Sequence, residues 1–114
     1  MKAVSSMIRI GINTYAFLWN ETVEDTVRIL GEEGFKGIEF LVSPPQWNLE
    51  DYRPGKYKEL KKILDSYGMK VLAMNIPSLD MNSASVFPEM RKLTLELYKK
   101  LTHISLELES EIML

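Results

Sequence analysis

The amino-acid sequence predicts an α/β fold with parallel strands. Three short apolar runs alternate with three segments whose apolar residues recur at helical spacing. The second and third runs, residues 36–42 and 69–76, are apolar almost throughout, as is typical of strands buried on both faces of a parallel sheet. Strands that alternate with helices in this way are expected to form a parallel sheet with right-handed crossovers.

The first unit is expected to combine a strand over residues 8–15 with a helix over residues 22–33. The strand segment is short and rich in β-branched residues. Thr22 precedes the helix and Asp25 follows three residues later, which resembles a capping box. Gly34 stands where a glycine commonly ends a helix.

The second unit is expected to combine the strand over residues 36–42 with a helix over residues 56–67. The third unit combines the strand over residues 69–76 with a helix over residues 88–106. Pro88 suits the first turn of that last helix, where its missing N–H costs nothing.

Two junctions between a helix and the following strand match each other. Gly34-Phe35-Lys36 and Gly68-Met69-Lys70 lie 34 residues apart, which is one strand–helix unit. A barrel of eight such units in ~250 residues repeats every ~31 residues. We therefore expect residues 8–114 to form the first three units of a (β/α)8 barrel, after a leader over residues 1–7.

The end of the chain allows two interpretations. Apolar and polar residues alternate from Ile104 to Leu108, as in a half-buried strand. The helical spacing of the preceding segment also continues through the same residues. We favour a helix that frays past about Leu106, because Glu107 and Glu109 would interrupt an apolar fourth strand.

The composition argues against several classes of function. The chain has 114 residues, enough for one modest domain, and its net charge of −2 gives no electrostatic reason to bind nucleic acid or an anionic membrane. No apolar run reaches the ~18–20 residues of a membrane span. The absence of cysteine suits a cytoplasmic protein. His103 is the only histidine, so the chain cannot supply a site of several imidazole ligands.

Short motifs along the chain carry a resemblance to a known family. They are Ile10-Gly-Ile-Asn-Thr-Tyr15, Gly34-Phe-Lys-Gly-Ile-Glu-Phe40, Asn75-Ile-Pro-Ser-Leu-Asp80, Pro88-Glu-Met-Arg91 and Leu97-Tyr-Lys-Lys-Leu101. In this order and at this spacing, they resemble the N-terminal part of the xylose isomerase-like TIM barrel superfamily. That superfamily includes sugar isomerases, sugar phosphate isomerase/epimerases and AP endonucleases of family 2 (endonuclease IV type). The resemblance stops before Ser105-Leu-Glu-Leu-Glu109, so we expect a truncated, frame-shifted or cut-down chain.

The resemblance implies a fragment of a metal-dependent sugar or sugar phosphate isomerase/epimerase. Full-length members hold a divalent metal (Mn, Mg, Zn or Co) at the ends of later strands and move a proton beside a sugar carbonyl. Those positions would lie beyond Leu114. We therefore expect no catalytic residue, metal ligand or cofactor in this chain, and no activity from it alone.

Residues at the carboxyl ends of the strands are the candidates for binding a sugar in the complete barrel, because barrel enzymes bind their ligands there. These candidates are Asn13, Tyr15, Trp19, Glu39 and Asn75. The asparagines suit either sugar hydroxyls or turns. The aromatic side chains, with Phe17, suit either stacking on a sugar ring or capping of the core.

Glu39 is the most informative candidate, because a carboxylate within an apolar strand is costly unless it is paired or solvated. It either faces the barrel mouth and holds a substrate hydroxyl, or forms an ion pair with Arg9 or Lys70. Asp80 is expected in a loop or capping role, and His103 on a helix surface.

Three functions stay open. A fragment of a sugar isomerase or epimerase is favoured. The DNA-repair branch is disfavoured by the net charge of −2 and the lack of basic clusters. The third is a non-enzymatic α/β domain that assembles with copies of itself. Because three apolar strands would leave core and sheet edges exposed, we expect the isolated chain to self-associate.

Overall fold

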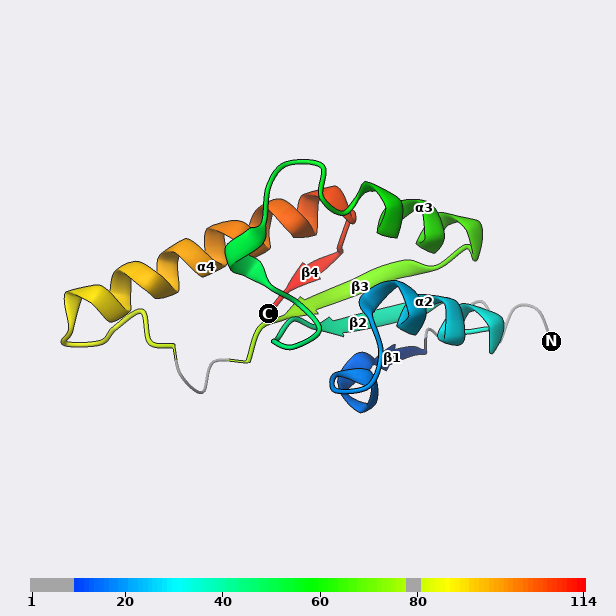
Figure 1. Cartoon of the computed structure of the whole chain (residues 1–114), viewed down its shortest axis with the longest axis horizontal. Coiled ribbons are helices and arrows are strands. Elements are labelled where there is room, and N and C mark those ends of the chain that lie inside the picture. The colour runs from blue at the N-terminus through cyan, green and yellow to red at the C-terminus, as the bar shows by residue number, and fades with distance from the viewer. Residues whose placement is uncertain (1–9, 78–80) are drawn as a thin grey trace.

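Four parallel strands form the sheet of the computed structural model, which describes residues 10–77 and 81–114. They lie in sequential order and are β1 (Gly11–Asn13), β2 (Gly37–Leu41), β3 (Lys70–Asn75) and β4 (Ile112–Met113) (Figure 1). The α/β class and the parallel arrangement predicted from the sequence are confirmed. The expected leader, residues 1–7, lies outside the described residues.

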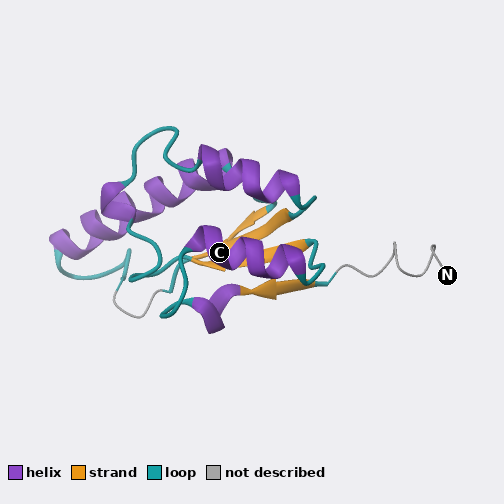
Figure 2. Cartoon of the chain, turned by 45° about the vertical axis from the view of Figure 1, so that its right-hand side comes forward, coloured by secondary structure: helices purple, strands orange, loops and turns teal. Residues whose placement is uncertain are grey.

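Three α-helices connect the strands and pack on one face of the sheet (Figure 2). They are α2 (Val23–Glu32), α3 (Lys58–Ser66) and α4 (Pro88–Glu107), and short 3-10 helices η1 (Thr14–Phe17) and η2 (Leu49–Asp51) precede α2 and α3. Right-handed crossovers between strands in sequential order place every helix on the same side. No helix among the described residues is both long and apolar enough to cross a bilayer.

The ends of the helices follow local signals in the sequence. The Thr22 hydroxyl accepts a hydrogen bond from the Asp25 N–H at 3.1 Å and so caps α2. Gly34 and Gly68 follow α2 and α3 with φ of 94° and 65°, a conformation that glycine adopts without a steric penalty. Pro88 occupies the first turn of α4, as expected.

The first strand is shorter than predicted. Thr14 and Tyr15, which were expected in the strand over residues 8–15, begin η1 instead. The physical reason is the Asn13 side-chain oxygen, which accepts a hydrogen bond from the Tyr15 N–H at 2.8 Å and turns the chain.

The three expected strand–helix units are present, and a short fourth strand that was not expected follows them. The helical interpretation holds through Glu107, after which Glu109 (φ 54°) reverses the chain and Ile112–Met113 form β4. β4 pairs in parallel with β3, and the Leu114 N–H donates to the Met74 carbonyl at 2.8 Å. The alternating residues from Ile104 belong to the end of α4, as favoured, and the strand lies further along the chain.

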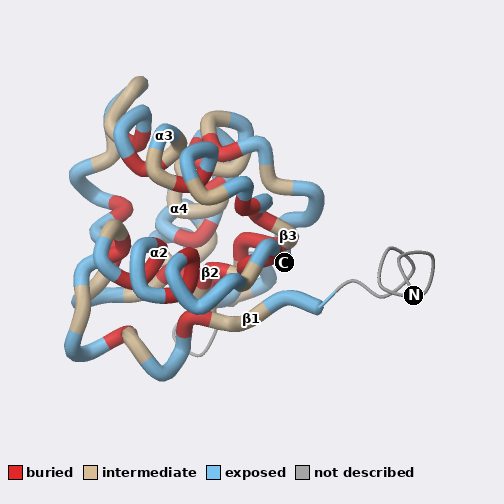
Figure 3. The backbone as a smooth tube through the Cα atoms, turned by 90° about the vertical axis from the view of Figure 1, so that its right-hand side faces the viewer, coloured by how far each residue is buried: buried red, intermediate tan, exposed pale blue. Residues whose placement is uncertain are grey.

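The hydrophobic core fills the layer between the sheet and the helices (Figure 3). Its fully buried side chains include Ile38, Phe40 and Met74 from the sheet and Val27, Leu60, Leu64, Leu101 and Ile104 from the helices. On the opposite face of the sheet, Leu41, Leu72 and Asn75 are only half-buried. No described helix covers that face, which corresponds to the inner face of a barrel.

Two glycines in the strands leave room for the Leu72 side chain on this uncovered face. A Cβ atom at Gly11 or Gly37 would lie 2.6 or 2.5 Å from Leu72 Cδ1. Leu72 therefore packs directly on the backbone of β1 and β2, at the point where the register between β2 and β3 shifts. This contact gives the uncovered face a small apolar layer of its own.

Candidate functional site

Asn13 and Glu39 lie side by side at the carboxyl ends of β1 and β2. They are register partners of the parallel pairing, and the Asn13 Nδ2 group donates a hydrogen bond to Glu39 Oε1 at 2.5 Å. Both side chains are half-buried on the uncovered face. The structure therefore brings together two of the five predicted candidates.

The ion pair considered for Glu39 does not form with Lys70. Lys70 is the register partner of Gly37, toward the opposite end of the sheet. Among the described residues, Asn13 is the hydrogen-bond partner of Glu39, and Arg9 lies outside those residues. A neutral amide leaves the negative charge of Glu39 available to another group.

Asn13 forms a turn and also positions a carboxylate. Its Oδ1 atom accepts from the Tyr15 N–H and caps η1, while its Nδ2 group faces Glu39. Of the two roles considered from the sequence, the structure shows the turn, and binding of sugar hydroxyls stays a prediction. Both ends of the amide are engaged, so Asn13 holds Glu39 in one orientation.

Thr14 also stabilises the carboxyl edge of the sheet, and the sequence analysis did not identify it. Its buried hydroxyl accepts a hydrogen bond from the Leu41 N–H at 3.0 Å and ties η1 to the end of β2. The two residues are 27 positions apart, and no local pattern predicts such a bond.

The predicted aromatic candidates are exposed. Tyr15 and Trp19 keep 67% and 72% of their surface accessible, so capping of the core is wrong for both. Phe17 is partly buried and packs against the core. The side chain of Asn75, at the end of β3, is half-buried and makes no hydrogen bond to the described residues.

Two further sequence candidates lie away from this edge or outside the description. His103 is exposed on α4, as expected, and its ring stacks on Tyr52 with centroids 6.2 Å apart. Asp80 lies outside the described residues.

A hollow of about 720 Å³ opens beside the carboxyl ends of β2 and β3. Most of its lining is apolar, from Leu18, Leu41, Val42, Trp47, Leu49, Ile76, Pro77, Met81 and Leu97. Tyr15 is the one predicted candidate that lines it. We call it the carboxyl-end hollow.

The loop after β2 forms one wall of this hollow and was missed by the sequence analysis. The Gln46 amide donates to the Thr26 hydroxyl at 2.9 Å and to the Glu21 carbonyl at 3.1 Å, which fixes the loop against α2. Trp47 packs edge-on against Phe40, with ring centroids 5.2 Å apart. The Trp47 indole N–H is buried and has no hydrogen-bond partner in the part of the chain that the structure describes.

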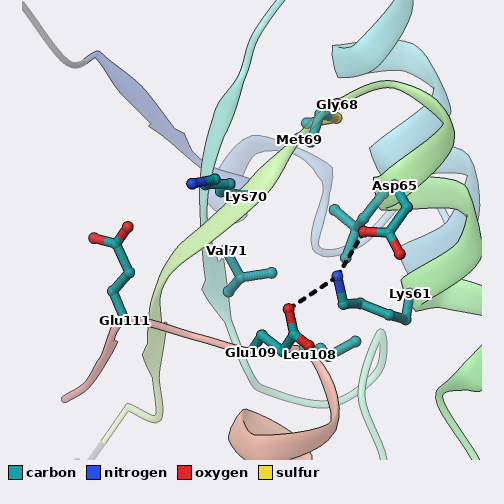
Figure 4. A pocket seen from close by; sticks show the side chains of 10 residues that line it. Lys61, Asp65, Gly68, Met69, Lys70, Val71, Leu108, Glu109 and Glu111 are labelled. Carbon is teal, nitrogen blue, oxygen red and sulfur yellow. Dashed lines mark hydrogen bonds and ion pairs between the residues drawn. The ribbon is translucent and has the colours of Figure 1, made fainter.

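A second hollow of about 440 Å³ lies toward the amino ends of the strands (Figure 4). There Lys61 pairs with Asp65 at 2.5 Å and with Glu109 at 3.5 Å, which links α3 to the turn after α4. These carboxylates and their hydrogen bonds raise the pKa of Lys61. In barrels this end of the sheet serves stability, so we assign the ion-pair cluster a structural role.

The described residues do not fit a catalytic metal. They contain no cluster of three or more His, Asp or Glu side chains that could hold an ion. At the carboxyl edge, Glu39 faces a neutral amide, and a divalent cation needs several converging oxygen or nitrogen ligands.

No protein-family model and no curated protein sequence matches the chain. Solved structures do share its fold. A candidate 3-DHS dehydratase, AsbF from Bacillus anthracis, matches with a TM-score of 0.66 at 19% identity, over 93% of this chain and 37% of its own. A candidate sugar phosphate isomerase/epimerase from Anabaena variabilis matches with a TM-score of 0.62 at 26% identity, over 90% of this chain and 35% of its own.

An AP endonuclease of family 2 from Brucella melitensis matches with a TM-score of 0.57 at 18% identity, over 93% of this chain and 40% of its own. These neighbours are xylose isomerase-like TIM barrels, the superfamily that the sequence motifs resemble. The chain therefore has the fold of part of a (β/α)8 barrel. It spans less than half of the length of each of these structures.

Proposed function

We propose that the chain supplies a substrate-binding part of a sugar or sugar phosphate isomerase/epimerase-type barrel. The observation that carries this proposal is the pairing of Glu39 with Asn13 at the carboxyl edge of the uncovered face. Ligands of (β/α)8 enzymes bind at that edge. The likeness to a candidate sugar phosphate isomerase/epimerase supports the same class of substrate.

Glu39 would accept hydrogen bonds from sugar hydroxyls in this arrangement. A carboxylate is an acceptor with about four lone-pair sites, and Asn13 uses one oxygen of the two. Asn13 acts as a positioning residue, because its amide orients the carboxylate and contributes no reactive group. Asn75 and Tyr15 would add polar and stacking contacts from β3 and η1.

Catalysis would need more groups than the pair formed by Asn13 and Glu39 supplies. Proton transfer beside a carbonyl requires a positioned acid and base, and the family's reaction adds a divalent metal, Mn, Mg, Zn or Co, to polarise the oxygens. We place these groups on later strands of a complete barrel and propose that this chain alone is inactive.

The second candidate function is DNA repair, favoured by the likeness to the family 2 AP endonuclease. A protein that binds the DNA backbone needs a cluster of Lys and Arg side chains. The chain has a net charge of −2, and no Lys, Arg or His of residues 10–77 and 81–114 lines its carboxyl-end hollow. We therefore prefer the sugar substrate.

The exposed edges of the sheet suggest that the partner of the chain is a second copy of itself. Ile10 beside β1 and Ile112 on β4 keep 70% and 54% of their surface exposed at the two edges of the sheet. We propose that isolated chains self-associate through these edges.

We also propose a cytoplasmic location, since the chain has no cysteine that could form a disulfide in an oxidising compartment.

Nuclear magnetic resonance of the isotope-labelled chain tests the proposed substrate class. D-xylose or D-fructose should shift the Asn13 side-chain amide signals in a saturable way, and a DNA duplex with one abasic site should leave them unmoved. Glu39→Gln should weaken the sugar effect severalfold, whereas Glu33→Gln, on an exposed residue after α2, should not. Shifts caused by the DNA and not by the sugars would favour the repair function instead.

A further inference from the structure

We infer that the carboxyl-end hollow selects an uncharged sugar ring over a phosphorylated one. This inference rests on the proposed function and narrows its substrate class. It follows from the charges and hydrogen bonds of the lining, which differ from those of a phosphate site.

The lining offers apolar walls and one accessible aromatic ring. Leu49, Ile76 and Leu97 come from three different elements or loops and meet around a hollow of about 720 Å³. Tyr15 lies in the same lining with 67% of its surface exposed. The C–H face of a sugar ring packs on such surfaces, while its hydroxyls need polar groups at the rim.

The polar groups of the rim accept hydrogen bonds more readily than they donate them. The Asn48 side chain is engaged at both ends, with the Glu50 N–H at 3.2 Å and Asp51 Oδ2 at 2.8 Å. The Ser43 hydroxyl donates to the Pro44 carbonyl at 3.2 Å. Glu50 is exposed, and its carboxylate has no partner among the described residues.

A phosphate group would meet repulsion here and find no cation. Phosphate sites in proteins use Lys or Arg side chains, or a helix N-terminus. Among the described residues, the lining contains no Lys, Arg or His, and Glu50 is its one charged side chain. A sugar hydroxyl, by contrast, can donate a hydrogen bond to the Glu50 carboxylate. The hollow therefore favours a neutral donor-rich ring over a dianion.

Trp47 provides a signal at the hollow itself. Its indole lies beneath the lining with only 1% of its surface exposed, and its N–H has no hydrogen-bond partner among the described residues. We expect a ligand in the hollow to change the resonance of this N–H through the side chains that pack around the indole. The chain has two tryptophans, and a Trp19→Phe variant assigns the Trp47 signal by elimination.

The test is a titration of the unmodified chain with D-fructose and with D-fructose 6-phosphate, followed at the Trp47 indole N–H. We expect D-fructose to shift the signal saturably and the phosphate ester to bind at least tenfold more weakly. Glu50→Lys should narrow or reverse this preference. The matched control Glu33→Lys makes the same charge change outside the lining and should leave the preference intact.

Equal or tighter binding of the phosphate ester would overturn the inference, as would an indole signal that neither sugar moves. An unchanged preference in Glu50→Lys would also overturn it. The Asn13 amide signals separate these results from failure of the proposed function. A sugar that shifts Asn13 but not Trp47 binds at the carboxyl edge and outside this hollow.

Discussion

The Asn13 amide on β1 holds the Glu39 carboxylate on β2 through a hydrogen bond of 2.5 Å between register partners. The same asparagine caps η1 through the Tyr15 N–H. One side chain thus ends the first strand and orients the only carboxylate within the described strands. This coupling gives the carboxyl edge a structural role beside the binding role that we propose for it.

Removal of the Asn13 side chain should destabilise the fold. Asn13→Ala loses the cap of η1 and a hydrogen bond to a charged group, and we expect a loss of about 2 kcal/mol in the free energy of unfolding. Urea denaturation followed by circular dichroism measures this. Asn20→Ala, on an exposed loop residue, is the matched control. Equal midpoints for the two variants would contradict the role given to Asn13.

Gly31→Ala should destabilise α2, although alanine is normally the better helix former by about 1 kcal/mol. The reason is the Tyr67 ring, which lies where the new Cβ atom would be placed. Overpacking costs about 1–3 kcal/mol and outweighs the gain in propensity. In a Tyr67→Ala background the sign should reverse, and the same substitution should stabilise. A stabilising effect in the unmodified chain would show that the ring moves aside freely.

Stability should fall in alkaline solution because of Tyr57. Burial, followed by the carboxylates of Glu24 and Glu107, raises the pKa of Tyr57 from 10.0 to about 12. As pH rises, the unfolded chain loses the Tyr57 proton before the folded chain does. The free energy of unfolding that Tyr57 contributes is therefore constant below pH 10 and falls as pH rises from 10 toward 12, by about 1.4 kcal/mol per pH unit. Unfolding midpoints across this range should decline less steeply for Tyr57→Phe. The control Tyr15→Phe, which removes an exposed hydroxyl, should decline like the unmodified chain.

Self-association should depend on the edge of the sheet formed by β4. A lysine at Ile112 places a charge on that edge, and edge lysines oppose strand pairing between chains. We expect Ile112→Lys to weaken association at least tenfold in sedimentation equilibrium. Leu106→Lys adds the same charge to an exposed position of α4 and should have little effect. A monomeric unmodified chain at tens of micromolar would count against the proposed association.

The order and direction of the elements could be predicted because their signals are local. Thr22, Gly34, Gly68 and Pro88 act within one turn of their own helix ends, and the structure uses them as expected. Strand β4 could not be predicted in the same way. It has two residues, and its pairing with Ala73 and Met74 depends on a turn that only the folded α4 creates.

Only the part of the candidate site that follows from the order of the strands could be predicted from the sequence. Its position follows from the general rule that ligands bind at the carboxyl ends of strands, and Asn13 and Glu39 were found from it. The contacts of Thr14 with Leu41 and of Gln46 with Thr26 join residues 27 and 20 positions apart. Spacing along the sequence carries no information on such bonds.

Calorimetric titration of Mn²⁺, Mg²⁺, Zn²⁺ and Co²⁺ into the purified chain, with ketose–aldose conversion assayed on a panel of sugars, tests the central claim most directly. The claim is that this chain binds substrate but lacks the metal ligands and the acid and base of the reaction. The account predicts no metal affinity in the micromolar range and no conversion with any of the four ions. Micromolar metal binding together with metal-dependent conversion would place the catalytic site within these 114 residues and contradict the account.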